Sequence, residues 1–312
     1  MPQQLLGLHH VTATVDDAQD DLDFYMGVLG QRLVKKTVNF DNNQVYHFYY
    51  GTERGASGTI MTTFPYRSQG VRLGIKGTGQ VTHTAFAVPQ YSLDFWIARL
   101  RAAGSPVVPS ARLGQPVLSF HDPSSLNLEL VGQNEDSREP WTTDEVDPAR
   151  AIRGIHSVTL SLADPAATIA LLTQTLGFTV IGEEGQRTRL RAARNETGGC
   201  VDLLHEPERA PSVNGTGTVH HVALAISTEQ EQEELRGELL ELGYQVSPVR
   251  DRKYFRSIYF RERGGVLIEV ATVGPGFTVD EPLESLGREL KLPDWEEVER
   301  SEIESALPQI EY

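Results

Sequence analysis

Two histidine doublets carry the clearest chemical signal in the chain: His9 and His10 in GLHHVTATV, and His220 and His221 in TVHHVALAI. Neutral imidazole is a common ligand of transition metals and also exchanges protons near neutral pH. Both doublets lie in runs of alternating residues that indicate β-strands, so successive side chains point to opposite faces. The face shared by His220 and Val222 is apolar enough to meet a helix. The second histidine of each doublet is therefore predicted to face the open side of its sheet.

The same register continues in two further strands, HTAFAV and SVTLSL, and in four later ones, GTIMT, SLNLE, GGCVD and GVLIE. From the first strands it predicts a column of open-face residues, namely His10, His83, Ser157 and His221. From the later strands it predicts a second column, namely Thr62, Glu129, Asp202 and Glu269. Two imidazoles and one carboxylate on one face form the facial triad that binds non-haem Fe(II) and leaves coordination positions open.

The pattern alone leaves three such triads open, depending on which strands adjoin. They are His10 with His221 and Glu269, His10 with His83 and Glu129, and His221 with Glu269 and Asp202. Three other histidines have no carboxylate in register and are predicted to be structural, namely His47, His121 and His205.

The strands that would position these residues belong to four copies of one βαβββ module, covering about residues 6–66, 80–132, 153–206 and 217–273. In each copy the first strand is followed by an amphipathic stretch that ends on a glycine, as helices with a left-handed C-terminal residue do. One module alone leaves the concave face of its sheet uncovered, so modules must pair. The predicted fold is therefore α+β, with four βαβββ modules paired into two cup-shaped half-barrels.

The polar stretch GQNEDSREPWTTDEVDPARA predicts the main boundary along the chain. It separates a first pair of modules within residues 1–140 from a second pair within residues 150–273. Residues 274–312 form a C-terminal extension, and its acidic last twenty residues predict a solvated helix or tail.

The composition excludes several classes of protein. The 312 residues carry a net charge of −15, which argues against nucleic acid or an anionic membrane as a partner. Cys200 is the only cysteine, so no intrachain disulfide or cysteine-based zinc site can form. The sequence shows no signal segment and no apolar run of about 18 residues, so we expect a cytoplasmic protein.

The sequence resembles the vicinal oxygen chelate superfamily of glyoxalase, bleomycin-resistance and extradiol dioxygenase proteins, which are built of paired βαβββ modules. It is most similar to the ring-cleaving hydroquinone dioxygenase branch, on GLHHVTATV, QRLVKKTVNFD, GTIMTTFP, TVHHVALAI, PVRDRKYF, SIYFRERGGVLIEVAT and GPGFTVDEP. The resemblance implies that modules one and four pair and that His10, His221 and Glu269 hold a metal. Fe(II) is the expected ion, with Mn(II) or another divalent metal as the alternative. The branch has no ligand at His83, and a second site at His83 and Glu129 stays open.

The resemblance also implies roles for residues near the metal. Tyr259 shares a strand face with Ser257, and a phenol there could donate a hydrogen bond or pass a proton. Arg252 in DRKYF would hold a phenolate or the carboxylate of an opened ring. His220, together with His9, would fix the ligands or shuttle a proton.

Together these features predict a metal-dependent dioxygenase that opens hydroquinone-type or catechol-type aromatic rings. The expected partners are a small aromatic substrate and O2, and a homo-oligomer is compatible with the sequence. One alternative is a glyoxalase-like isomerase or thiol transferase with the metal as Lewis acid. Thr62 stands where that chemistry would want a fourth carboxylate ligand, which counts against it. The other alternative is a metal-free small-molecule-binding resistance protein, which would need no ligands in register.

Overall fold

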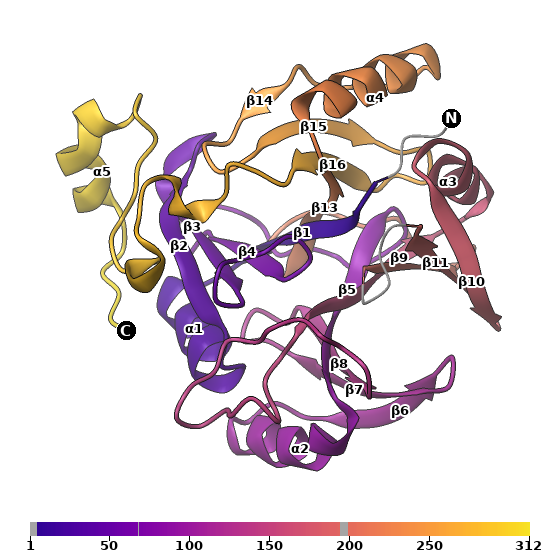
Figure 1. Ribbon diagram of the computed structural model, residues 1–312, viewed down its shortest axis with the longest axis horizontal. Helices are drawn as coiled ribbons and strands as arrows, with labels where there is room; N and C mark the ends of the chain where they lie inside the picture. Colours follow the sequence, from indigo (N-terminus) through magenta and orange to yellow (C-terminus); the bar gives the residue numbers. More distant parts are fainter. Residues whose placement is uncertain (1–4, 68, 194–198) are drawn as a thin grey trace.

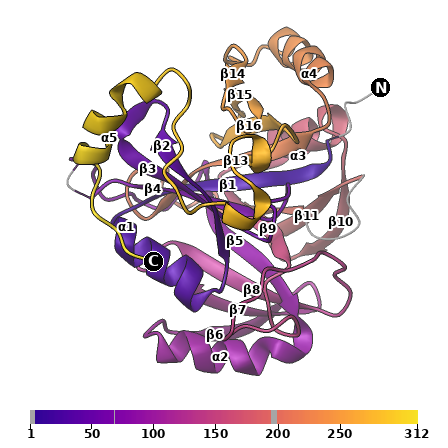
Figure 2. The same cartoon turned by 60° about the vertical axis from the view of Figure 1, so that its left-hand side comes forward.

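The computed structural model describes residues 5–67, 69–193 and 199–312 and consists of two curled sheets with the helices at the periphery (Figures 1 and 2). Each sheet has eight strands. The predicted α+β fold with two half-barrels is confirmed. No helix in these described ranges has both the length and the apolar character needed to cross a membrane.

Each predicted module contains one helical segment and its strands. Module one consists of β1 (Gly7–Val15), α1 (Ala18–Leu22), the π-helical turn η1 (Asp23–Val28), β2 (Arg32–Asn39), β3 (Asn42–Gly51) and β4 (Ile60–Pro65). Module two consists of β5 (Gln80–Pro89), η2 (Gln90–Ser92), α2 (Leu93–Ala102), β6 (Val108–Arg112), β7 (Gln115–His121) and β8 (Asn127–Gln133). Module three consists of β9 (Gly154–Leu162), α3 (Ala166–Ala170), η3 (Leu171–Thr175), β10 (Phe178–Glu184), β11 (Arg187–Ala192) and β12 (Cys200–His205).

Module four and the extension complete the chain. Module four consists of β13 (Thr218–Ile226), α4 (Glu229–Glu241), β14 (Arg250–Asp251), β15 (Arg256–Arg261) and β16 (Leu267–Thr272). The extension contains η4 (Phe277–Val279), η5 (Leu283–Ser285), η6 (Glu297–Glu299) and α5 (Arg300–Ala306).

The predicted helix ends follow from local sequence. Asp17 precedes α1, and its Oδ1 accepts hydrogen bonds from the backbone N–H groups of residues 19 and 20. The glycines predicted to follow the four helices all have positive φ, between 65° and 84°: Gly30, Gly104, Gly177 and Gly243. The helices therefore stop where the sequence places a residue that tolerates the left-handed conformation.

The sheets do not follow the order of the modules along the chain. The first sheet has the order β14-β15-β16-β13-β1-β4-β3-β2, and the second has the order β10-β11-β12-β9-β5-β8-β7-β6. Module four thus pairs with module one through β13 and β1, and module three pairs with module two. The halves 1–140 and 150–273 each contribute one module to each sheet. The pairing of modules one and four implied by the resemblance is therefore present.

A β-bulge interrupts β1 at its histidine doublet. Leu8 lies opposite Leu224 and His10 lies opposite Ala223, so His9 is an extra residue in the ladder. Such a bulge breaks the strict alternation of side chains and re-aims the residues around it.

A second bulge interrupts β13 at the other doublet. Thr12 lies opposite His221 and Ala13 lies opposite Val219, so His220 is the extra residue. In both doublets the first histidine is therefore the extra residue in the pairing of β1 with β13.

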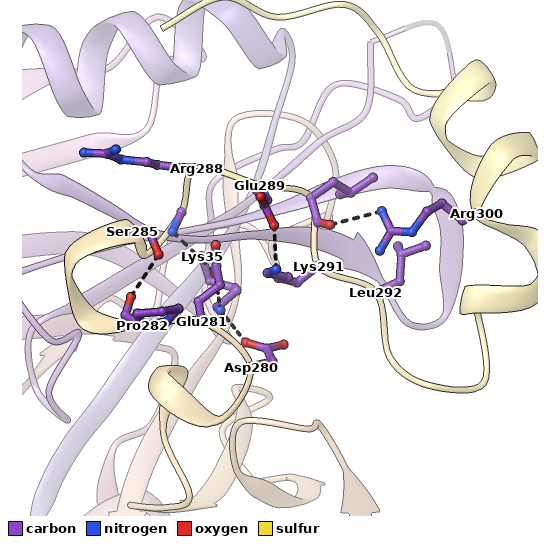
Figure 3. A network of polar contacts seen from close by, with 12 residues as sticks. Lys35, Asp280, Glu281, Pro282, Ser285, Arg288, Glu289, Lys291, Leu292 and Arg300 are labelled. Atoms are coloured by element: carbon purple, nitrogen blue, oxygen red, sulfur yellow. Dashed lines mark hydrogen bonds and ion pairs between the residues drawn. The ribbon is translucent and has the colours of Figure 1, made fainter.

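The C-terminal extension returns to module one. Its residue Leu290 forms a bridge with Lys36 of β2, the outermost strand of the first sheet (Figure 1). Lys35 is fully buried, and its ammonium contacts Asp280 at 2.6 Å and also Glu281 (Figure 3). The predicted terminal helix is present as α5, but it is not fully solvated, because Ile303 on it is buried.

Candidate metal centre

Three side chains from the centre of the first sheet converge on one point. His10 on β1 and His221 on β13 have their Nε2 atoms 3.3 Å apart. Glu269 Oε2 on β16 lies 2.8 Å from His221 Nε2 and 3.3 Å from His10 Nε2. All three residues are buried. Within the described ranges, no other group of at least three His, Cys, Asp or Glu side chains brings its ligand atoms within 4.8 Å of one another.

These spacings suit a metal ion. Two ligands at right angles on an ion, each at about 2.1 Å, stand about 3.0 Å apart. Glu269 Oε2 is buried and, in the part of the chain that the structure describes, faces only the Nε2 atoms of His10 and His221 without a hydrogen bond of good geometry, although Ser257 Oγ donates to the other carboxylate oxygen. A buried carboxylate oxygen without such a donor needs another partner. A divalent ion among the three ligand atoms would supply it.

The charge states also suit a metal. Burial lowers the pKa of His221, which favours the neutral imidazole that binds metals. Burial opposes ionisation of Glu269, but the neighbouring His10 and His221 hold its pKa well below its ordinary value. The group therefore presents a neutral imidazole at His221 and a carboxylate anion at Glu269.

The first histidine of each doublet holds the second. His9 and His10 share a hydrogen bond of 2.8 Å between their Nδ1 atoms, and His220 and His221 share one of the same length between theirs. With each ligand histidine donating from Nδ1, the lone pair of its Nε2 is directed to the shared point. Burial, with the neighbouring His10, lowers the pKa of His9 to about 3, so His9 is a neutral acceptor.

A cavity of about 330 Å³ opens above this point. The rings of six phenylalanine and tyrosine residues line it, namely Phe40, Tyr49, Phe64, Tyr66, Phe255 and Tyr259. All six residues predicted for the site also line it, namely His10, His220, His221, Arg252, Tyr259 and Glu269. The prediction that His220 faces the helices is wrong, because the bulge in β13 turns this residue to the exposed rim of the cavity.

Tyr259 and Arg252 form a pair on one wall of the cavity. Arg252 Nε donates to Tyr259 Oη over 3.1 Å, and the guanidinium lies 5.3 Å from the centre of the tyrosine ring. Burial and the charge of Glu269 raise the pKa of Tyr259, so the phenol stays protonated. Since its oxygen accepts from Arg252, the phenol proton is free to be donated elsewhere.

His47 on β3 also lines the cavity, although a structural role was predicted for it from the sequence. Its Nε2 lies 3.0 Å from Thr62 Oγ1, and Thr62 in turn donates to Thr12. Burial, with the neighbouring His10, lowers the pKa of His47 well below its ordinary value, so the ring is neutral. The available signal was the alternation in QVYHFYYG, which puts His47 on the same strand face as Tyr49.

The two alternative triads predicted from the pattern are wrong. His10 and His83 lie in different sheets, and so do Glu269 and Asp202. A pair of residues cannot share a metal when they line two separate cups.

The second sheet uses its own carboxylates differently. Glu129 accepts two hydrogen bonds of 2.7 Å from Arg112, and Asp202 is held by Arg189 at 2.6 and 2.8 Å and by Arg187 at 3.0 Å. These guanidinium groups occupy the oxygens that a metal would need. The open possibility of a site at His83 and Glu129 therefore has no support from this geometry.

Comparison with known proteins agrees with this architecture. The family model described as the Glyoxalase/Bleomycin resistance protein/Dioxygenase superfamily matches residues 7–130 and 154–270. The chain belongs to this superfamily. Its matched regions are the two pairs of modules, one on each side of the predicted boundary.

Curated relatives cover almost the whole chain. It is 42% identical over 307 residues to a Bacillus subtilis (strain 168) protein named "Putative ring-cleaving dioxygenase MhqO", covering 98% of this chain and 97% of that protein. It is 36% identical over 299 residues to the chlorohydroquinone/hydroquinone 1,2-dioxygenase of Sphingobium indicum, covering 94% of this chain and 92% of that enzyme.

Solved structures show the same fold. A crystal structure of a "putative dioxygenase" from Bacillus subtilis subsp. subtilis str. 168 matches with a TM-score of 0.95 and 41% identity, covering 99% of this chain and 98% of that one. Glyoxalase I from Zea mays matches with a TM-score of 0.65 and 16% identity, covering 85% and 92%, a likeness of fold alone. The near relatives thus support an oxygenase.

Proposed function

We propose that this protein is a metal-dependent dioxygenase that cleaves hydroquinone-type aromatic rings with O2, with catechol-type rings as the second class of substrate. The observation that carries the proposal is the convergence of His10, His221 and Glu269 at the floor of an aromatic-lined cavity. The hydroquinone class is supported by the name of the relative from Sphingobium indicum.

The three ligands would hold a divalent metal, Fe(II) by preference and Mn(II) as the alternative, because two imidazoles and one carboxylate leave positions open on such ions. When bound, the metal would supply a common attachment point for a substrate oxygen and O2, together with redox chemistry.

The cavity fits one flat aromatic ring. Its volume of about 330 Å³ lies at the lower end of ordinary ligand pockets. Phe255 packs against His10 with 5.2 Å between ring centres, so an apolar face lies beside the ligands. Phe64 and Tyr49 extend this surface around His47. Such walls favour a neutral ring and exclude water from it.

The polar residues of the cavity, Arg252, Tyr259 and His220, would bind negative charge and transfer protons. Arg252 stays a cation, because Tyr259 and Asp41 outweigh burial and raise its pKa. It can therefore hold a phenolate or the carboxylate of the opened ring. Tyr259 can donate the proton of Oη to an oxygen in the cavity, and His220 at the exposed rim can pass a proton between the cavity and solvent.

The isomerase and transferase alternative has less support. It would need a fourth ligand opposite Glu269, and the corresponding position on β4 is Thr62. The hydroxyl of Thr62 is already engaged with Thr12 and His47. In the metal-free binding alternative the buried oxygen of Glu269 would face only the Nε2 atoms of His10 and His221, and this convergence of three ligand atoms would have no use.

The proposal is tested by oxygen uptake of Fe(II)-loaded, anaerobically prepared protein on addition of methylhydroquinone, with catechol in parallel. Wild type should consume about one O2 per ring opened. Glu269→Gln and His10→Ala should lose at least about 100-fold in rate, since each removes a ligand. His83→Ala is the matched control in the other sheet and should retain activity. Tight metal binding without uptake on either substrate would reject ring cleavage.

A further inference from the structure

Asp41 links the two outermost strands of the first sheet across the cavity. It lies in the turn between β2 and β3, whereas Arg250 and Arg252 lie at β14, the opposite end of the strand order. Arg250 Nη1 donates to Asp41 Oδ1 over 3.2 Å, and Arg252 Nη2 donates to Asp41 Oδ2 over 3.1 Å. All three residues line the cavity, and because Asp41 and Arg250 are also exposed, these ion pairs lie at its rim.

The turn that carries Asp41 is itself fixed. Asn39 Oδ1 accepts a hydrogen bond of 2.9 Å from the backbone N–H of Asp41, and Asn39 Nδ2 donates to Tyr66 Oη over 2.9 Å. The ring of Phe40 packs edge-on against Trp295 of the extension, with 5.7 Å between centres. The carboxylate of Asp41 therefore lies on a hairpin whose conformation is held by these hydrogen bonds and by the contact with Trp295.

The contact with Asp41 also sets the orientation of Arg252. The planar guanidinium uses Nε for Tyr259 and Nη2 for Asp41, and its Nη1 has no protein partner within the described ranges. Nε and Nη2 are neighbouring donors along one edge of the planar group, and two anchors there leave it little freedom to rotate. Asp41 therefore determines which edge of Arg252 remains available to an oxygen in the cavity.

We infer that Asp41 is a positioning residue. Its ion pairs hold the β2–β3 turn to the β14 segment at the opening of the cavity, and they orient Arg252 toward the bound aromatic ring. This inference rests on the proposed function for its substrate. Asp41 and Arg250 have exposed side-chain fractions of 58% and 46%, so their pair is weak and screened by salt, whereas Arg252 is only 17% exposed and its pair with Asp41 is less screened. Such a fastening can open for a ligand to pass and close again over it.

The test compares Asp41→Asn with a matched variant, Asp294→Asn. Asp294 is also an exposed aspartate paired with a cation of the same segment, Lys253 at 3.1 Å, but it does not line the cavity. Hydrogen exchange of metal-loaded protein is measured over residues 39–44 and 249–256. Asp41→Asn should speed exchange in both segments about 3- to 10-fold, whereas Asp294→Asn should leave residues 39–44 unchanged.

Kinetics provide the second measurement. With methylhydroquinone, Asp41→Asn should lower kcat about 10-fold, because Arg252 loses an anchor, and should change KM by less than about 3-fold. Asp41→Glu, which keeps the charge, should recover most of the loss. Added NaCl should lower the kcat of wild type toward that of Asp41→Asn and leave the variant unaffected, a response that a merely structural residue would not give.

The outcomes are separable. Unchanged exchange in Asp41→Asn, or faster exchange with wild-type kinetics, would overturn the role of Asp41. If wild type consumes no O2 with any aromatic diol, the proposed function fails. Asp41 is then judged by exchange and by anaerobic binding of methylhydroquinone, which must weaken in Asp41→Asn for the inference to stand.

Discussion

His9 and His220 decide which nitrogen of each ligand histidine faces the candidate metal centre. Each occupies the Nδ1 atom of its neighbour over 2.8 Å, so only Nε2 of His10 and His221 is left for a metal. Outer partners of this kind orient the ligand ring and raise its basicity. In each doublet the second histidine is therefore the candidate metal ligand, and the first histidine orients it through the hydrogen bond between their Nδ1 atoms.

Replacing either supporting histidine should weaken metal binding. We expect His9→Ala and His220→Ala to lower metal affinity about 10- to 100-fold, because the ligand ring loses its orienting hydrogen bond. Competition with a chromophoric chelator measures this. His156→Ala is the control, since His156 occupies a bulge in the second sheet and hydrogen-bonds Ser157 there. Unchanged affinity in both doublet variants would show that the bulges serve only the fold.

Tyr259 is expected to affect turnover without affecting the metal. Tyr259→Phe removes the only proton that this side chain can give, and loss of a positioned acid costs about 10²-fold or more in kcat. Metal content should stay at the wild-type level. Tyr244→Phe is the comparison, because Tyr244 packs on Phe260 and does not line the cavity. Equal kcat values for Tyr259→Phe and wild type would remove Tyr259 from the chemistry.

At the scale of elements, α1 is attached to its sheet by a buried acid. Asp21 Oδ2 accepts hydrogen bonds from Tyr50 Oη at 2.7 Å and Thr63 Oγ1 at 2.6 Å. Burial raises the pKa of Asp21 to about 8 and that of Asp122 to about 7. At neutral pH the folded protein thus retains a proton on Asp21 that the unfolded chain releases.

This proton predicts how stability changes with pH. Because the folded pKa is raised, the contribution of Asp21 is fully present below about pH 4 and is lost as pH rises to about 8. Asp21→Asn mimics the protonated acid and should flatten this part of the profile. At pH 8 it should raise the melting temperature by a few degrees, roughly 2–4 °C for each kcal/mol gained. A melting temperature lower than wild type at pH 8 would mean that Asp21 is ionised and paired in the fold.

The sequence predicted the strands and the open-face residues because alternation survives over most of their length. It did not predict the bulges, since an inserted residue such as His9 leaves no mark in the pattern of apolar positions. The position of His220 was missed because of the bulge in β13. The position of His47 was missed because a single histidine on a strand does not by itself indicate a functional site. The pairing of β1 with β13 joins strands that are far apart in the sequence, and the alternation of residues along each strand does not determine which strands pair.

At the scale of the whole molecule, the candidate metal centre exists only when distant parts of the chain meet. His10 comes from the first strand, and His221 and Glu269 come from the last module. The extension then passes from module four back to β2 of module one. Asp280, which pairs with buried Lys35, also accepts a hydrogen bond of 3.1 Å from Tyr254 Oη, next to Phe255 in the cavity wall. The extension thereby connects modules one and four, the two modules that contribute the residues of the candidate metal centre.

Replacing Lys35 would measure how much the contact between the extension and module one stabilises the protein. Lys35→Ala would leave Asp280 and Glu281 without their buried cation, and removing one partner of a buried ion pair costs about 3–5 kcal/mol. Lys291→Ala is the control, taken from the extension itself (Figure 3), because its partner Glu289 is 74% exposed and the pair should contribute less than about 1 kcal/mol. Urea unfolding of both variants measures the free energy of unfolding. A loss below about 1 kcal/mol in Lys35→Ala would show that the contact between the extension and module one does not depend on the buried ion pair.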